Sequence, residues 1–162
     1  MILGFKAVNV KDAQLSQAKI IRANPERFHP DIPGTAYFDP EPEHLSRYYN
    51  SEPSKRIYFV ALDENEQVVG GAGAAEFDGI ESCAELQKLY LDDPVKGKGY
   101  GKELLRTVEN RARSVGYKNL YLETHTNLSA ALKLYEKTDF RQIDKPCSAQ
   151  HSTMNCFYLK EL

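Results

Sequence analysis

The chain has 162 residues, a length typical of one domain that buries a substantial core. Its 21 Lys and Arg residues nearly balance its 23 Asp and Glu residues, and the net charge of −2 argues against nucleic acid or an anionic membrane as a partner. The apolar runs are too short to span a membrane, and the N-terminal residues lack the basic lead and sustained apolar stretch of a signal peptide.

The cysteines Cys83, Cys147 and Cys156 are odd in number and show no C-x-x-C spacing. This pattern is typical of reduced thiols and disfavours both a disulfide framework and a zinc site. We therefore expect a cytoplasmic protein without a bound metal.

The first part of the chain is expected to hold a strand and two helices. Residues 3–10 alternate in strand fashion, and the apolar spacing over 11–23 predicts a helix. The segment 24–42 is rich in Pro, Asp and Gly and predicts a long loop with several aromatic residues. A second, short helix is expected over 43–50.

Strands and helices alternate in the remainder of the chain. A hairpin is expected over 57–63 and 67–77, followed by a strand over 82–91 and an amphipathic helix over 100–115. We expect the remaining strands at 118–124, 140–143 and 153–160, with a helix at 129–137. This order predicts a mixed α/β fold built on one central sheet, with residues 1–162 forming a single domain.

The most informative segment is 89–105, which reads LYLDDPVKGKGYGKELL. A strand leads into three alternating glycines, and a helix follows them. Glycines let backbone amides approach a ligand closely, and the helix start adds free N–H groups and the positive end of its dipole. The loop therefore predicts a phosphate or pyrophosphate site, formed by Gly97, Gly99 and Gly101 with added charge from Lys96, Lys98 and Lys102.

Two common phosphate-binding patterns do not fit this loop. The Walker A pattern requires four residues between its first Gly and the Gly-Lys pair, but only three separate Gly97 from Gly101, and Glu103 stands where Ser or Thr would bind magnesium. The dinucleotide fingerprint fails because Leu104 occupies the place of its third glycine.

The loop instead resembles the acetyl-CoA-binding motif of the GNAT N-acetyltransferase superfamily, (Arg/Gln)-x-x-Gly-x-(Gly/Ala). It reads Lys96-Gly97-Lys98-Gly99-Tyr100-Gly101, with Lys96 in the place of Arg or Gln. The segment 127–140, NLSAALKLYEKTDF, is similar to a second GNAT motif, Asn-x-x-Ala-x-x-Leu-Tyr-x-x-x-Gly-Phe, with Asp139 in the place of Gly. The resemblance covers nearly the whole chain.

The resemblance implies a fold and a set of contacts. The fold would be one mixed, mostly antiparallel sheet of six to seven strands with helices on both faces. Acetyl-CoA would be the cosubstrate, with its pyrophosphate on the 96–102 loop, Lys102 included, and its pantetheine arm along the backbone of Leu89, Tyr90 and Leu91. Asn127 would contribute to cofactor binding, with Ser129 as the alternative because Asn127 lies one residue further from the motif tyrosine than usual.

Two residues are expected to transfer protons, one as the general acid and one as the general base. The resemblance implies that Tyr135 donates a proton to the departing CoA thiolate; the alternative is an ordinary, half-buried helix tyrosine. Glu85 lies eleven residues before Lys96, an offset that resembles the glutamate base of GNAT histone acetyltransferases. Glu123 and Glu81 are weaker candidates, and a solvated or ion-paired strand glutamate is the alternative reading of Glu85. By strand alternation, Gln87, Leu89 and Leu91 are expected to lie on the same face of the strand as Glu85.

Other reactive residue types suggest little chemistry. No pair of the four histidines has metal-ligand spacing, and His125 lies nearest the expected cleft. Cys83 would suggest an acyl-cysteine intermediate, but a strand cysteine is usually a small hydrophobic residue. Tyr37, Tyr48 and Tyr49 are candidates either for an acceptor pocket or for packing.

We therefore expect an acyl-CoA-dependent N-acetyltransferase that transfers acetyl directly to a primary amine in a ternary complex. The alternative is a non-catalytic GNAT-like module that binds CoA or an amine; the failed Walker spacing disfavours a phosphotransferase. By the resemblance, the segment 23–42 would shape acceptor specificity, and its mixed charge leaves small-molecule and protein amines open. The oligomeric state is left open between a monomer and a homodimer.

Overall fold

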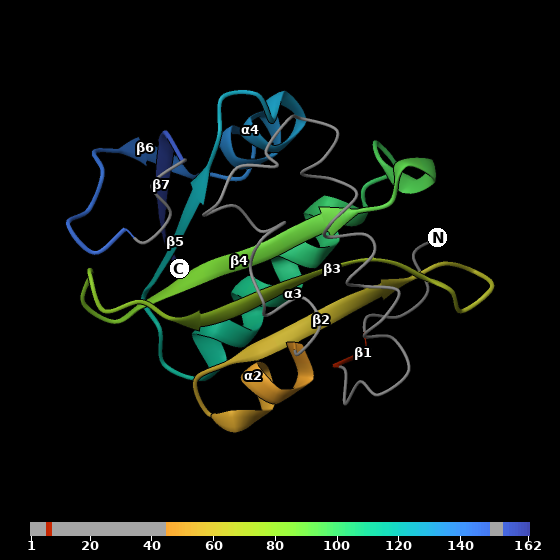
Figure 1. The fold of residues 1–162 in the computed structure, drawn as a ribbon, viewed down its shortest axis with the longest axis horizontal. Helices are drawn as coiled ribbons and strands as arrows, with labels where there is room; N and C mark the ends of the chain where they lie inside the picture. Colours follow the sequence, from red (N-terminus) through yellow and green to blue (C-terminus); the bar gives the residue numbers. More distant parts are fainter. Residues whose placement is uncertain (1–5, 8–44, 150–153) are drawn as a thin grey trace.

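The structure, a computed structural model, describes residues 6–7, 45–149 and 154–162 (Figure 1). Its strands are β1 (Lys6–Ala7), β2 (Ile57–Leu62), β3 (Val68–Glu76), β4 (Cys83–Leu91), β5 (Asn119–Thr124), β6 (Arg141–Ile143) and β7 (Cys156–Glu161). Its helices are α2 (Leu45–Ser51), α3 (Tyr100–Ser114) and α4 (Ser129–Glu136), with a 3-10 turn η2 at Asp93–Val95.

The predicted elements from residue 43 onward are confirmed, with bounds that shift by at most three residues. The short turn η2 was not predicted. The expected helix over 11–23 and the loop over 24–42 lie outside the described residues, and so does most of the strand over 3–10.

Seven strands form one sheet in the order β1-β2-β3-β4-β5-β7-β6. Five of its neighbouring pairs are antiparallel, and only β4 and β5 run parallel. The predicted mixed, mostly antiparallel sheet of six to seven strands is confirmed.

Helices cover both faces of this sheet, as predicted. Along β2, Phe59 joins the large apolar cluster that contains the buried side chains of α3 and α4, whereas Tyr58 and Val60 pack with Tyr49 of α2. Because neighbouring strand residues point to opposite faces, α2 lies on the face opposite α3 and α4.

The helix α3 supplies the main apolar cover. Leu104, Leu105 and Val108 are almost fully buried, and their spacing of one, three and four residues places them on one side of a helix. Gly116 has a φ of 99° just beyond the helix, as expected for a glycine that ends a helix in the left-handed conformation.

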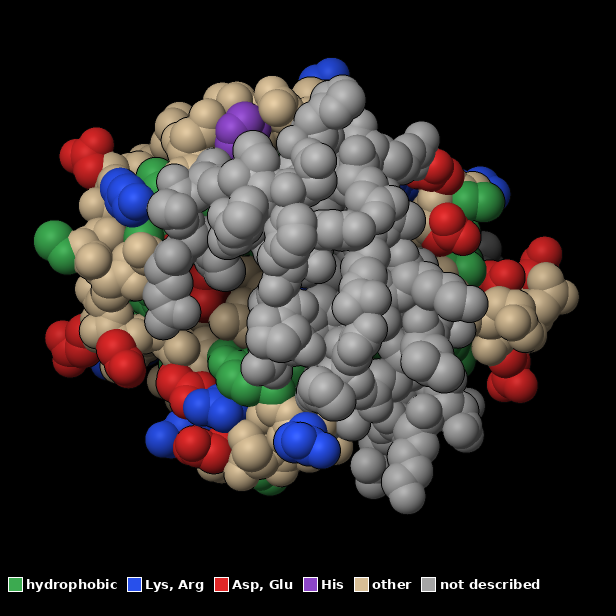
Figure 2. Space-filling model, in the orientation of Figure 1, with side chains coloured by type: hydrophobic (Ala, Val, Ile, Leu, Met, Phe, Trp, Pro, Cys, Tyr) green, Lys and Arg blue, Asp and Glu red, His purple; other side chains and the backbone are tan. Residues whose placement is uncertain are grey.

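Charged side chains of both signs are interspersed around the described rim of the face shown in Figure 2. The helices in the described ranges are all too short or too polar to cross a bilayer.

A buried ion pair fastens α3 to the last strand. The Lys160 Nζ atom of β7 donates to Glu109 Oε1 of α3 at 2.8 Å, and the two side chains are only 12% and 8% exposed. Arg113 lies 3.8 Å from the other oxygen of Glu109, but its side chain is 45% exposed. Lys160 is therefore the partner that compensates most of the cost of burying the carboxylate.

Replacing Lys160 should destabilise the fold much more than replacing Arg113. In Lys160→Met the Glu109 carboxylate stays buried without its close partner, so we expect the free energy of unfolding to fall by about 3 kcal/mol. Arg113→Met removes only a screened contact and should stay within about 0.5 kcal/mol of wild type. Urea denaturation measures both, and equal effects of the two variants would contradict this assignment.

Candidate active site

The parallel strands β4 and β5 stay together over a short stretch only. Their register pairs are Cys83 with Asn119, Ala84 with Leu120, and Glu85 with Tyr121. Beyond Glu85, β4 continues beside β3 and β5 continues beside β7, so the two strands diverge (Figure 1). No described strand fills the space between them. A strand edge of this kind presents backbone groups with which an extended ligand can pair.

A β-bulge lies in the diverging half of β4. Lys88 adopts a φ of 51°, and the register with β3 shifts between Gly71 and Gly73. The hydroxyl of Tyr58 donates to the carbonyl oxygen of Lys88 at 3.0 Å and so supports the bulge from β2. The bulge reverses which residues face each side of the sheet from this point onward.

The expectation that Glu85, Gln87, Leu89 and Leu91 share one face is wrong beyond the bulge. Glu85 and Gln87 do lie on one face and are joined by a hydrogen bond. Leu89 and Leu91, however, pack against the apolar cluster on the α3 side, and Tyr90 packs with the tyrosines on the α2 side. The extra residue of the bulge breaks the simple alternation.

The glycine loop is fixed at both ends and exposed between them. Val95 and Tyr100 are buried in the main cluster, whereas residues 96–99 are exposed. The Asp92 carboxylate accepts a hydrogen bond from the backbone amide of Asp93 at 2.9 Å and caps the turn that begins the loop. The loop is therefore held in place without side chains covering it.

Backbone amides of this loop remain available to a ligand. Gly97 and Gly99 have φ values of 76° and 92°, and an added Cβ at either position would meet no atom within 4 Å. The first helical amide with a backbone acceptor is that of Glu103, which donates to Gly99 O at 3.1 Å. In this loop, the amides without an acceptor among the described residues are those of Gly97, Gly99, Tyr100, Gly101 and Lys102. Such a group of amides at a helix start suits an anion.

The lysines of the loop differ in their surroundings. Lys96 forms an ion pair with Asp93 at 2.9 Å, which partly neutralises its charge. Lys98 and Lys102 are exposed and add positive charge to the rim of the loop.

Three elements meet at Gly101. A Cβ on this residue would lie 3.3 Å from Leu134 Cδ2 of α4 and 3.4 Å from Leu91 Cδ1 at the end of β4. The start of α3, the end of β4 and the side of α4 that carries Leu134 are therefore in contact. This close approach requires a small residue at position 101.

Tyr135 follows Leu134 on α4 and is buried against Phe140 and Tyr158, with ring centroids 5.7 and 6.1 Å away. Burial raises the pKa of Tyr135 above its ordinary value, so the phenol is neutral and carries its proton at pH 7. Its hydroxyl donates to no residue in the described part of the chain. Asp139 adopts a φ of 67° beyond α4, as the sequence allowed for a residue in the glycine position.

Asn127 and Ser129 lie at the exposed start of α4. The backbone amide of Asn127 donates to His125 Nδ1 at 3.1 Å, which makes His125 part of the turn before the helix. Both candidate cofactor contacts are therefore accessible, and the histidine has a structural hydrogen bond.

Two carboxylates stand near the point where the strands diverge. Glu85 Oε2 accepts a hydrogen bond from Gln87 Nε2 at 2.8 Å, and Glu123 Oε1 accepts one from the Tyr121 hydroxyl at 3.1 Å. The second oxygen of Glu123 is buried and has no partner among the described residues. The sequence favours Glu85 by its offset from Lys96, and it holds no local signal for an unsatisfied oxygen on Glu123.

Cys83 is not suited to covalent catalysis. It is buried, its thiol donates to the neighbouring carbonyl oxygen of Ala84, and burial raises its pKa to about 12. A neutral, inaccessible thiol is a poor nucleophile, so the structure disfavours an acyl-cysteine intermediate.

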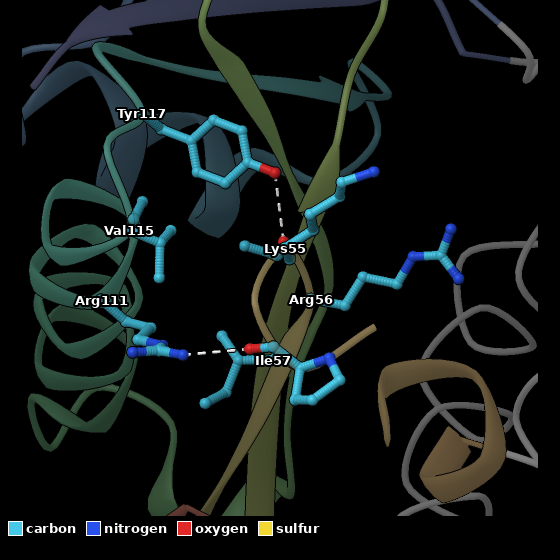
Figure 3. Close-up of a pocket in the computed structure, with 9 residues that line it drawn as sticks. Lys55, Arg56, Ile57, Arg111, Val115 and Tyr117 are labelled. Carbon is cyan, nitrogen blue, oxygen red and sulfur yellow. Dashed lines mark hydrogen bonds between the residues drawn. The ribbon is translucent and has the colours of Figure 1, made fainter. Parts of the chain in front are cut away.

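A small pocket lies at the other end of α3, between that helix and the start of β2 (Figure 3). Arg111 donates to the carbonyl oxygen of Pro53 at 3.0 Å, and the Tyr117 hydroxyl donates to that of Lys55 at 3.2 Å. These bonds attach α3 to the loop before β2, and the pocket is remote from the glycine loop. Across the described ranges, no group of His, Cys, Asp and Glu has an arrangement that holds a metal ion.

Comparison with known proteins agrees with this geometry. Residues 25–140 match the family model described as "Acetyltransferase (GNAT) family". The chain is 41% identical over 112 residues to the uncharacterized N-acetyltransferase YjgM of Escherichia coli, a match that covers 68% of this chain and 65% of that protein. The match thus spans slightly less than two thirds of that relative.

Solved structures share the whole fold. An acetyltransferase of the GNAT family from Staphylococcus aureus superposes with a TM-score of 0.83 over 98% of both chains, at 22% identity. A phosphinothricin acetyltransferase from Sinorhizobium meliloti, solved in complex with AcCoA, superposes with a TM-score of 0.76 at 22% identity. The match covers 100% of this chain and 89% of that one.

Proposed function

Since the chain belongs to the GNAT family of acetyltransferases, we propose that it transfers the acetyl group of acetyl-CoA directly to a primary amine within a ternary complex. The observation that carries the proposal is the group of amides of Gly97 and residues 99–102, which have no acceptor among the described residues and lie beside the end of β4, where β4 and β5 diverge. The acceptor is an amine of a small molecule or of a protein. The three free cysteines favour the reducing cytoplasm as its location.

The described residues fit acetyl-CoA. The amides of the glycine loop suit its pyrophosphate, and Lys98 and Lys102 supply positive charge nearby. The backbone of Leu89, Tyr90 and Leu91 lies on the diverging half of β4 and suits the extended pantetheine arm. Asn127 or Ser129 adds a polar contact from the start of α4. Acetyl-CoA supplies the activated acyl group.

Tyr135 serves as the general acid in this proposal. A thiolate that leaves a thioester needs a proton, and a phenol that stays neutral at pH 7 has one to give. Leu134, its neighbour on α4, lies beside Gly101 at the start of α3, so this helix lies beside the loop proposed to bind the cofactor.

Glu85 serves as the general base, and Glu123 is the second candidate. An alkyl ammonium must lose a proton before it can attack a thioester. Glu85 lies at the last register pair of β4 and β5, where the space between the strands begins. Glu123 is favoured by a different observation: one of its oxygens is buried without a partner in the described part of the chain, and an ammonium donor would satisfy it.

A test of the function measures CoA release from acetyl-CoA in the presence of a panel of primary amines. Amine-dependent release supports an enzyme. CoA binding without release for any amine in the panel would favour the alternative of a non-catalytic module, and the absence of CoA binding would overturn the proposal.

Gly99→Glu should abolish CoA binding while leaving the fold cooperative. The new carboxylate repels phosphate at the centre of the amide group, and the φ of 92° is unfavourable for glutamate. The fold should persist because a Cβ there meets no atom within 4 Å. Lys96→Ala, which removes only a screened charge, is the control and should bind CoA nearly normally. Calorimetric titration showing wild-type affinity in Gly99→Glu would disprove the loop assignment.

Tyr135→Phe should lower kcat by roughly 10²-fold, the usual range for a general acid. CoA affinity and melting temperature should hardly change, because the ring is kept and no described residue loses a hydrogen bond. The matched control is Tyr158→Phe, which removes a hydroxyl from the neighbouring ring and should retain near wild-type kcat. Unaltered turnover in Tyr135→Phe, with chemistry rate-limiting, would assign Tyr135 to packing.

Glu85→Gln should lower kcat/KM near neutral pH and recover activity toward alkaline pH, where more of the amine is already neutral. The pH–rate profile is the measurement, with Glu81→Gln as a control at an exposed position. A wild-type profile in Glu85→Gln, together with a changed one in Glu123→Gln, would transfer the role of base to Glu123.

A further inference from the structure

A chain of two hydrogen bonds connects α2 to Glu85. The Tyr49 hydroxyl donates to Gln87 Oε1 at 2.8 Å, and Gln87 Nε2 donates to Glu85 Oε2 at 2.8 Å. All three side chains lie on the face of the sheet opposite α3. The contact joins residues 38 positions apart in the sequence and was not predicted from it.

The direction of both hydrogen bonds follows from the carboxylate. An ionised Glu85 can only accept, so the amide of Gln87 must turn its NH₂ group toward Glu85 and its oxygen toward Tyr49. Tyr49 is then required as a donor. The two hydrogen bonds thus have one possible direction, and together they hold the carboxylate of Glu85 in a defined position.

The sheet leaves space for the Tyr49 side chain at Gly73. Gly73 of β3 is the register partner of Gln87, and a Cβ on Gly73 would lie 2.8 Å from both Cζ and the hydroxyl of Tyr49. The Tyr49 side chain is only 3% exposed, and its ring lies 5.1 Å from that of Tyr58. The missing side chain at position 73 therefore lets the hydroxyl reach Gln87.

We propose that Tyr49 and Gln87 are positioning residues that hold Glu85 in place as the general base and so connect α2 to the chemistry. The inference rests on the proposed function and on the role of Glu85 within it. Tyr49 and Gln87 touch neither substrate in this proposal; they act only through Glu85.

Several groups in the described part of the chain surround Glu85. Burial above all, with the negative charge of Glu85 as a smaller contribution, raises the pKa of Tyr121, Cys83 and Tyr48, so these groups stay neutral. The nearby carboxylates are Glu123, bonded to Tyr121, and Glu76, whose pKa is lowered mainly by its hydrogen bonds to Arg56.

The first measurement is the pH profile of kcat/KM for Gln87→Met, which removes the N–H donor but keeps the length of the side chain. Loss of a donor to a carboxylate favours its protonated form, so the acid limb should move to higher pH by about one unit. As the pH falls, the ionised base, and with it kcat/KM, is then lost at a higher pH than in wild type. An acid limb identical to wild type would overturn the proposal.

The second measurement is a double-mutant cycle with Tyr49→Phe, which keeps the ring over Gly73 and removes only the hydroxyl. Alone it should lower kcat roughly three- to tenfold by loosening Glu85, with CoA affinity unchanged. In the Glu85→Gln background it should have no further effect. An equal loss in both backgrounds would show that Tyr49 acts independently of Glu85 and would overturn the proposal.

The matched control is Tyr117→Phe, which likewise removes one hydrogen-bonding hydroxyl, in this case one that donates to the backbone carbonyl of Lys55 at the remote pocket of Figure 3. It should leave kcat and the pH profile unchanged. CoA release measured on every variant separates the two levels of inference. A wild-type enzyme that releases no CoA with any amine contradicts the proposed function, whereas an active enzyme with additive variants contradicts only the positioning role.

Discussion

The divergence of β4 and β5 beyond Glu85 is the constraint on which the rest of the site depends. A parallel pair needs a long crossover, and here that crossover contains the glycine loop and α3, so the loop must lie at the end of β4. The same divergence separates the backbone of β4 from its neighbour just where the strand leads to the loop. One topological feature thus places the separated half of β4 beside the glycine loop, whose amides at Gly97 and 99–102 have no acceptor among the described residues.

The two faces of β4 differ in this arrangement, since one packs into the apolar core and the other forms polar hydrogen bonds. On the α3 side, Leu89 and Leu91 join the apolar cluster, and Leu91 contacts the loop through Gly101. On the opposite side, Glu85 and Gln87 form a polar network that reaches α2. The bulge at Lys88 makes both possible on one strand, because it turns the leucines toward the core after the polar residues. The strand therefore links the proposed cofactor contacts to the proposed proton transfer.

The sequence predicts the loop and the order of elements well because the required residues carry local signals. Gly97 and Gly99 adopt positive φ values that few other residues tolerate, and the buried stripe of α3 follows helical periodicity. The bulge has no such signal, since Lys88 is an ordinary strand residue that takes a left-handed conformation only in the assembled sheet. The bond from Tyr49 to Gln87 and the unsatisfied oxygen of Glu123 depend on long-range packing, which one sequence does not encode in any local pattern.

The strand β3, VVGGAGAAE, has a consequence for the face of the sheet that α2 covers. Gly73 lies so close to Tyr49 that even a methyl group would collide with it. At this position β3 therefore contributes backbone and no side chain to the face that α2 covers. The contour of that face is set by residues that approach from elsewhere, such as Tyr49. Substitutions in α2 can then change the contour of this face while the hydrogen-bonded framework of the sheet stays intact.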